Sequence, residues 1–404
     1  MKIRVEKTAL FLTIFIKRGI IIPMSDVIYL DHAATTPLDK RVFEKMRPYF
    51  CECYGNADSP HALGRKAQAA VDAARDCVAE LIGAKSNEIY FTSGGTESDN
   101  WAIMGGARAK RVEGRTQIVV STIEHHAVLS AVERLEKEGF EIVWLPVDEG
   151  GMVALQSIQD AVSDKTAIVC LMAVNNETGV KQPVEQAAAI AKERGALFFT
   201  DAVQAAPYMP IDVKAWGVDL LSFSSHKFYG PKGCGVLYIR SGVKMEKLVG
   251  GGEQERGMRG GTTNVPSVVG LAEAYRLIRV EMQENNTKLQ SLAETFMQEL
   301  APLDGIMRNG DKANALPSVL NLRFSGVENT SLLYNMDLQG VAFAAGSACA
   351  SASVKPSHVL TAMGLNETQA KESVRLSFGK DNTLEEVTRV AALLTDTLHR
   401  LRKK

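Results

Sequence analysis

The sequence predicts an α/β fold built on a mainly parallel, doubly wound sheet. Short apolar segments rich in Val, Ile, Leu and Phe alternate with helical patterns up to about residue 265. Most of these segments lack polar alternation, as expected of strands that are buried on both faces. Strands that alternate with helices form βαβ units, and such units favour a parallel sheet.

The expected elements can be placed in order along the chain. A helix over residues 65–83 has apolar residues at helical spacing and ends at Gly83. Seven strands and two further helices follow, with the strands over 88–92, 117–121, 141–147, 166–174, 196–200, 218–224 and 234–240 and the helices over 126–138 and 184–194.

The pattern changes after about residue 265. A long helical stretch over 268–300 precedes strands over 319–324 and 341–344 and helices over 357–363 and 384–401. We therefore expect a large ligand-binding domain over residues 37–265, and a smaller α+β domain formed by residues 24–36 and 266–404.

Composition and charge exclude several classes of protein. The 46 Lys and Arg residues nearly balance 47 Asp and Glu residues, for a net charge of −1, whereas a general nucleic-acid binder carries a basic excess. The six cysteines show no CxxC spacing, so neither a disulfide scaffold nor a metal site is expected. No apolar run approaches the roughly 18 residues of a membrane span. We expect a cytoplasmic protein that binds neither nucleic acid nor membrane directly.

Residues 1–23 form an N-terminal extension that needs separate treatment. Its apolar run from Ala9 to Ile16 is too short to span a bilayer and lacks the cleavage site of a signal peptide. Two interpretations remain open, namely a start-site artefact before Met24 and an ordinary N-terminal helix or strand.

Polar residues follow several of the expected strands, where ligands bind in open α/β sheets. The turn TSGGT at 92–96 could hold an anion, because small residues expose backbone N–H groups at a helix start; a capped turn without a ligand is the alternative. His125 could stack on a ring, transfer protons or bind a metal, or be an ordinary loop histidine. Asp201 ends an apolar strand, where a carboxylate needs a partner such as a metal, a ribose hydroxyl or a protonated ring nitrogen.

The segment SFSSHKFYGPKG at 222–233 carries the strongest signal. It places Lys227 directly after an apolar strand. A lysine near apolar walls and other cations can have a lowered pKa and form a Schiff base, whereas a lysine that contacts phosphate or solvent is the alternative. Together with Gly95, Thr96, His125 and Asp201, it matches the aldehyde, phosphate, ring and pyridinium nitrogen of pyridoxal 5'-phosphate.

Five motifs resemble those of one family. They are YLDHAATTP at 29–37, TSGGTESDN at 92–100, VNNETG at 174–179, SSHKFYGPKG at 224–233 and GSACASAS at 346–353. From Ile28 to Leu401 the chain resembles the cysteine desulfurases of the iron–sulfur-cluster and nitrogen-fixation type, within the class V aminotransferases. The resemblance implies a fold type I pyridoxal-phosphate transferase with a seven-stranded sheet.

The resemblance also implies a role for each matching residue. Lys227 would form the Schiff base, Asp201 would pair with the ring nitrogen, and His125 would stack on the ring and assist proton transfer. Arg375 and Asn176 would bind the substrate carboxylate. The remaining cofactor contacts would be Asn176 and Gln204 at the phenolic oxygen, Gly95, Thr96, Ser224 and His226 at the phosphate, and Thr262 at the phosphate of the neighbouring subunit's cofactor in a homodimer.

Cys349 would accept sulfur from L-cysteine as a persulfide, with L-alanine as the second product. Its loop contains only small residues, which suits an accessible nucleophile. The other five cysteines are expected to be small buried hydrophobes.

Two features depart from the family pattern, namely the extension 1–23 and the end of the chain at Lys404, where iron–sulfur-cluster relatives continue. The sulfur acceptor could therefore be an iron–sulfur scaffold protein or a tRNA-thiolation enzyme. A selenocysteine lyase or another class V aminotransferase is the alternative activity, and a non-catalytic partner is disfavoured by the intact Lys227, Asp201, His125 and Cys349.

Overall fold

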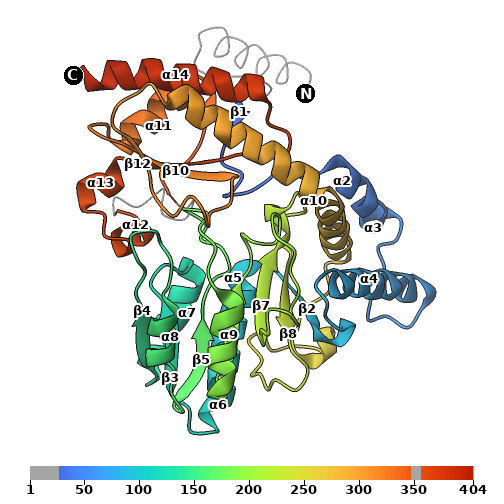
Figure 1. Cartoon of the computed structure of the whole chain (residues 1–404). Helices are drawn as coiled ribbons and strands as arrows, with labels where there is room; N and C mark the ends of the chain where they lie inside the picture. The colour runs from blue at the N-terminus through green and yellow to red at the C-terminus, as the bar shows by residue number, and fades with distance from the viewer. Residues whose placement is uncertain (1–26, 347–355, 404) are drawn as a thin grey trace, which may run out of the picture.

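The computed structural model describes residues 27–346 and 356–403, and its main feature is a seven-stranded sheet (Figure 1), called the large sheet below. Its strand order is β2-β8-β7-β6-β5-β3-β4. The strands are β2 (Ile89–Thr92), β3 (Gln117–Ser121), β4 (Glu141–Leu145), β5 (Thr166–Cys170), β6 (Leu197–Asp201), β7 (Leu220–Ser224) and β8 (Gly235–Ile239). All pairs are parallel except those of β8, which runs antiparallel to both of its neighbours. The prediction of a mainly parallel α/β sheet is confirmed.

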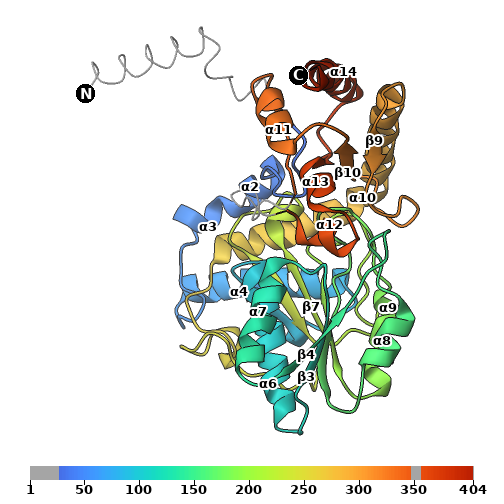
Figure 2. The ribbon, with the colours of Figure 1, turned by 90° about the vertical axis from the view of Figure 1, so that its left-hand side faces the viewer.

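Helices cover both faces of the large sheet. On one face, α6 (Gly106–Arg111) and α7 (His126–Lys137) share a hydrophobic core with the sheet; on the other, α8 (Leu155–Ala161) and α9 (Val184–Glu193) do so (Figure 2). Strands β3 and β5 to β8 are buried at every position. That burial explains their continuous apolar sequences. Shorter or peripheral helices are α2 (Lys40–Met46), α3 (Pro48–Cys51), α4 (Ala62–Leu81) and α5 (Gly95–Asn100).

A second, antiparallel sheet, the small sheet, has the order β12-β10-β9. Its strands are β9 (Ile306–Arg308), β10 (Val319–Phe324) and β12 (Ser373–Ser377), and β1 (Ile28–Tyr29) pairs separately with β11 (Val341–Ala342). The helices beside it are α11 (Asn329–Asp337), α12 (His358–Ala362), α13 (Glu367–Lys371) and α14 (Leu384–Arg402). Strand β9 was not predicted, because three partly exposed residues give no periodic signal.

One long helix, α10 (Val265–Leu300), belongs to both halves of the molecule. It begins at Asn264, whose side chain accepts a hydrogen bond from the backbone N–H of Ser267. The first half of α10 packs into the same core on the large sheet as α8 and α9, and the second half packs into the core of the small sheet. The predicted domain limits near residue 265 therefore stay a prediction.

The cysteines differ from expectation at one position. Cys53, Cys170 and Cys234 are buried as predicted, and Cys77 is partly buried. The prediction of burial is wrong for Cys51, because that residue ends the four-residue helix α3, which buries none of its side chains. Cys349 lies outside the described residues. No helix in the described part of the chain is long and apolar enough to cross a membrane.

Phe228, which follows Lys227 directly, tests how far ring packing supports the fold. Its fully buried ring lies 5.9 Å from Phe223 and 5.3 Å from Tyr275, between ring centroids. Phe228→Ala should lower the free energy of unfolding by about 3–5 kcal/mol in chemical denaturation, because the surrounding core cannot fill the cavity. Phe50→Ala, at an exposed position on α3, should change the free energy of unfolding by less than about 0.5 kcal/mol. Equal losses in the two variants would contradict a special contribution of the Phe228 ring to the core.

Candidate active site

A cavity of about 190 Å³ lies at the carboxyl ends of the parallel strands. It brings together residues from segments that are far apart in the sequence. They are Ala33, Ala34, Gly95, Thr96, Asp99, His125, Met172, Val174, Asn176, Asp201, Val203, Gln204, Ser224, His226, Lys227 and Arg375. Of the predicted site residues within the described chain, only Thr262 is missing from this lining. Thr262 lines another cavity, beside Arg259 and Thr263.

Glycines shape the anion-binding side of the cavity. Gly94 has a φ of 149°, a conformation that other residues rarely adopt. A Cβ added to Gly95 would lie 2.9 Å from Cγ2 of Val203, so a larger residue would have to push the cavity wall aside. The backbone N–H groups at the start of α5 have no partner inside the helix and can bind an anion there.

His226 joins the anion side to the segment after β1. Its Nδ1 lies 3.1 Å from Oγ1 of Thr35, and its backbone carbonyl accepts a hydrogen bond of 2.8 Å from the Thr36 hydroxyl. Burial, and then the charges of Lys227 and Lys232, lower the pKa of His226 to about 4. The neutral ring can therefore accept or donate a hydrogen bond at the cavity without carrying charge.

Lys227 is positioned by a short 3₁₀ turn, Ser225–Lys227, that directly follows β7. Its Nζ donates hydrogen bonds of 2.6 Å to the carbonyl of Ala33 and 2.9 Å to the carbonyl of Ala34. Both carbonyls belong to the YLDHAATTP motif, so this motif and the lysine segment form one wall. The amine is thus held at the cavity by the backbone of a distant segment.

Asp201 is the last residue of β6 and is 5% exposed. Its Oδ1 accepts a hydrogen bond of 2.8 Å from the backbone N–H of Val203. Burial raises the pKa of Asp201 to about 6, although the nearby charge of Lys227 works in the opposite direction. Close by in the sequence, the buried Oε1 of Gln204 has no hydrogen-bond partner among the described residues. Both groups fit a polar ring that would supply the missing partners.

His125 caps the N-terminus of α7. Its Nδ1 accepts a hydrogen bond of 3.2 Å from the backbone N–H of Ala127, which leaves the ring proton on Nε2. Burial is the largest cause that lowers the pKa of His125 to about 4, and the charge of Lys227 comes next. The result is a neutral ring with an N–H donor at the cavity.

Arg375 reaches the cavity from β12 of the small sheet and is 1% exposed. Its Nη1 donates a hydrogen bond of 2.9 Å to the carbonyl of Asn176, and its Nη2 contacts Oδ1 of Asp31 at 2.7 Å. The buried Nε has no partner among the described residues. This Nε–H group is available to a ligand, and a guanidinium suits the planar, bidentate recognition of a carboxylate.

Three acidic residues at or near this site were given no role by sequence reasoning. Asp31 pairs with Arg375, and Asp99 and Glu124 are buried beside the cavity. Each stands within or beside a conspicuous segment, namely YLDHAATTP, TSGGTESDN and EHH at 124–126. The burial of Asp99 and Glu124 and the contact of Asp31 with Arg375 depend on the tertiary structure, so the sequence contains no signal of them.

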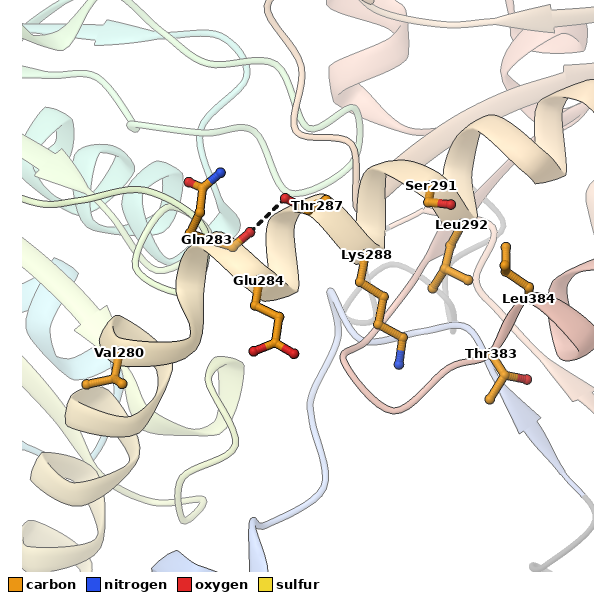
Figure 3. Close-up of a pocket in the computed structure, with 9 residues that line it drawn as sticks. All are labelled: Val280, Gln283, Glu284, Thr287, Lys288, Ser291, Leu292, Thr383 and Leu384. Atoms are coloured by element: carbon orange, nitrogen blue, oxygen red, sulfur yellow. Dashed lines mark hydrogen bonds between the residues drawn. The ribbon is translucent and has the colours of Figure 1, made fainter.

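A larger groove of about 850 Å³ runs along α10, away from the cavity (Figure 3). Of the residues that line it, Glu284 and Lys288 are the ones that titrate, and both extend from the same helix. The groove holds none of the predicted site residues. Its lining consists of Val280, Gln283, Glu284, Thr287, Lys288, Ser291, Leu292, Thr383 and Leu384.

The fold and the cavity together define a class of protein. One cavity at the edge of a parallel sheet is surrounded by a lysine that follows β7, an acid that ends the neighbouring strand β6, and a glycine-rich turn that can bind an anion. This arrangement is that of a pyridoxal-phosphate-dependent enzyme of fold type I. The chain belongs to the class-V aminotransferase family, whose model matches residues 28–390.

Individual relatives are similar over most of their length. A protein of Bacillus subtilis named putative cysteine desulfurase IscS 1 is 50% identical, with 93% of this chain and 99% of that protein covered. A cysteine desulfurase IscS of Methanosarcina thermophila is 46% identical, with 93% of each covered. Among solved structures, a NifS-like protein has a TM-score of 0.86 at 36% identity and covers 94% of this chain and 100% of its own. A structure titled SspA in complex with cysteine has a TM-score of 0.77 at 35% identity, with 87% and 98% covered.

Buried histidines predict how the protein responds to acid. Burial lowers the pKa of His32, His125 and His226 to about 4. Between pH 6.5 and 4 these three side chains bind fewer protons in the folded state than in the unfolded state, so their contribution to the free energy of unfolding should fall as the pH drops through this window. His32→Asn should make this fall shallower, by up to about 1.4 kcal/mol per pH unit.

Denaturation curves at several pH values measure this slope. His399→Asn is the matched control, because His399 is exposed on α14, and this variant should keep the slope of the wild type. If both variants show the same slope as the wild type, the lowered pKa of His32 is refuted.

Proposed function

We propose that this chain is a cysteine desulfurase, which removes sulfur from L-cysteine, releases L-alanine and carries the sulfur as a persulfide on Cys349. The observation that carries the proposal is the single cavity that places Lys227, Asp201, His125 and Arg375 around one space. Relatives at 50% and 46% identity named as cysteine desulfurases support the same activity.

The described residues fit pyridoxal 5'-phosphate, which when bound supplies an electron sink for a substrate amino acid. Lys227 would attach the cofactor through its amine, and Asp201 would hold the proton of the ring nitrogen. The Oε1 of Gln204, which has no partner within residues 27–346 and 356–403, lies buried in the same lining and fits a polar group of the ring. The other contacts would come from His125 at the ring face, Asn176 at the phenolic oxygen and Gly95, Thr96, Ser224 and His226 at the phosphate.

Lys227 is the proposed base for the α-proton of the substrate. Its Nζ is held by the carbonyls of Ala33 and Ala34, so the amine stays at the cavity when it is not bonded to the cofactor. His125 is neutral and presents its Nε2 proton, which suits an acid–base helper in the same proton transfers.

Arg375 and Asn176 form the proposed site for the substrate carboxylate. Arg375 is fixed through the Asn176 carbonyl and through Asp31, while its Nε has no partner among the described residues. A bound carboxylate would pair with this buried cation and orient the side chain of cysteine toward the acceptor thiol.

Cys349 completes the proposed reaction. Its thiolate attacks the sulfur of L-cysteine and forms the S–S bond of the persulfide, while the C–S bond of the substrate breaks and its electron pair stays with the carbon fragment. Protonation of that fragment gives L-alanine. We extend the proposal to a cytoplasmic homodimer in which Thr262 serves the neighbouring subunit. The sulfur acceptor would be an iron–sulfur scaffold protein or a tRNA-thiolation enzyme.

Lys227→Ala tests the cofactor attachment. Borohydride reduction of the wild type should fix the cofactor to the peptide that contains Lys227, whereas the variant should yield no labelled peptide because it lacks the amine. Lys232→Ala, which removes an exposed lysine outside the cavity lining, should label as the wild type does. Label on a different lysine in the Lys227→Ala protein would refute the assignment.

Cys349→Ser tests the sulfur transfer itself. The variant should keep its cofactor and still bind L-cysteine, but mass spectrometry after one turnover should detect no persulfide, because a serine hydroxyl is a poor nucleophile toward sulfur. Alanine release should fall roughly 100-fold or more.

Cys51→Ser removes an exposed thiol as a control and should retain both products. An enzyme that expels sulfide directly would leave the Cys349→Ser variant active, and that result would exclude the proposed reaction.

A further inference from the structure

Three carboxyl side chains are buried in or beside the wall of the cavity. Asp99 is 1% exposed, Glu124 0% and Asp201 5%. They come from three different elements, because Asp99 stands on α5, Glu124 precedes α7 and Asp201 ends β6. Asp99 and Asp201 both line the cavity, although only Asp201 has a role in the proposed function.

A serine on the strand beside Asp201 contacts Asp99 through its hydroxyl. Ser222 on β7 stands directly opposite Asp201 in the parallel register of the two strands. Its Oγ donates a hydrogen bond of 2.5 Å to Oδ1 of Asp99, and the serine is fully buried. The strand that pairs with β6 beside Asp201 thus also holds the Asp99 carboxyl group, and the charge of Asp201 acts on Asp99.

Different groups would stabilise a negative charge on Asp201 and on Asp99. Asp201 accepts a hydrogen bond from the backbone of Val203 and faces the cation of Lys227. Asp99 has the Ser222 hydroxyl, and within residues 27–346 and 356–403 no ion pair reaches it. Two carboxyl groups in one buried wall cannot both ionise without a large penalty, so the group with the weaker support keeps its proton.

The groups that face Asp99 from the other elements supply no positive charge. Glu124 accepts hydrogen bonds of 2.7 Å from the Ser121 hydroxyl and 2.8 Å from the Met172 N–H, while its Oε2 has no partner among the described residues. Cys170 on β5 is fully buried as well. Burial, followed by the charge of Asp201, raises the pKa of Asp99 well above its ordinary range, and burial raises that of Glu124 to about 8.

We propose that Asp99 is a positioning residue that keeps its proton in the working enzyme, so that the single negative charge of this wall resides on Asp201. This inference rests on the proposed role of Asp201 at the ring nitrogen. Asp99 acts through Asp201 and Ser222 and transfers no proton to the substrate. One carboxylate then faces one ring cation, and the buried wall carries no excess charge when the ring is bound.

Infrared spectroscopy of the full-length holoenzyme at pH 7 tests this directly, because a protonated carboxyl group has a C=O stretch that a carboxylate lacks. Asp99→Asn should remove one such band. Asp160→Asn, at an exposed acid on α8, should leave every band in place. Persistence of all bands in the Asp99→Asn protein would overturn the proposal.

Ser222→Ala provides a second variant in case Asp99→Asn fails to fold. It deletes the hydroxyl that touches Asp99 but leaves the acid, so the Asp99 band should shift in frequency and stay present. An unchanged spectrum in this variant would contradict the proposal as well, because the hydroxyl is the direct contact of the carboxyl group.

The pH dependence of stability separates a role in charge from a role in packing. With its raised pKa, Asp99 binds more protons in the folded state, so its contribution to the stability of the wild type should fall as the pH rises above the ordinary pKa of an aspartate. Asp99→Asn should reduce this fall, and the difference in unfolding midpoint should move in favour of the variant with increasing pH. A difference that stays constant would show a packing role and overturn the proposal. Neither readout uses turnover, so a wild type without desulfurase activity would refute the proposed function and leave this test intact.

Discussion

The buried guanidinium of Arg375 is the interaction on which the candidate site depends. It stands on the small sheet, yet its donors bind the Asn176 carbonyl beyond β5 and the Asp31 carboxylate after β1. A buried cation that loses one of its partners destabilises a protein by roughly 3–5 kcal/mol. The two sheets are therefore fixed in the relative position that closes the cavity, and the same arginine offers its remaining donor to that cavity.

The carboxyl edge of the large sheet concentrates polar groups that a stable core would exclude. Strands β3, β6 and β7 are buried at every position. Asp201 is the last residue of β6, His125 follows β3 and Lys227 follows β7, and all three line the cavity. Burial raises the pKa of Asp201 and lowers that of His125, and both shifts favour the neutral form. Within the described chain, the Oε1 of Gln204 has no hydrogen-bond partner. Buried polar groups of this kind are expected at a binding site, where a ligand supplies their missing partners.

The sequence predicted the architecture well where burial leaves a strong pattern. Strands β3 and β10 match their predicted ranges at both ends, because each is a bounded apolar run. The segment 166–174 was predicted as one strand, but β5 ends at Cys170, and residues 171–174 continue as buried chain whose backbone still bonds to β6 at Leu171 and Ala173. The antiparallel direction of β8 was not predicted, because a strand buried on both faces has the same composition in either direction.

The candidate site was predicted where chemistry follows a strand in the sequence and missed where it depends on distant contacts. Lys227, Asp201 and His125 each follow an apolar run, and the structure places all three at one cavity. Asp31 lies 344 residues from Arg375, so a single sequence gives no indication of that pair. Asp99 and Glu124 resemble ordinary surface acids until their burial is known, and Cys349, outside the described residues, stays a prediction.

The length of α10 has a consequence for how the molecule loses its structure. Its 36 residues extend over about 54 Å, and its side chains are shared between the hydrophobic cores of both sheets. Neither core can melt without exposing apolar surface of the helix that the other core needs. Heat or denaturant should therefore unfold the two cores in one cooperative transition, and a single protease cut within α10 would destabilise both cores at once.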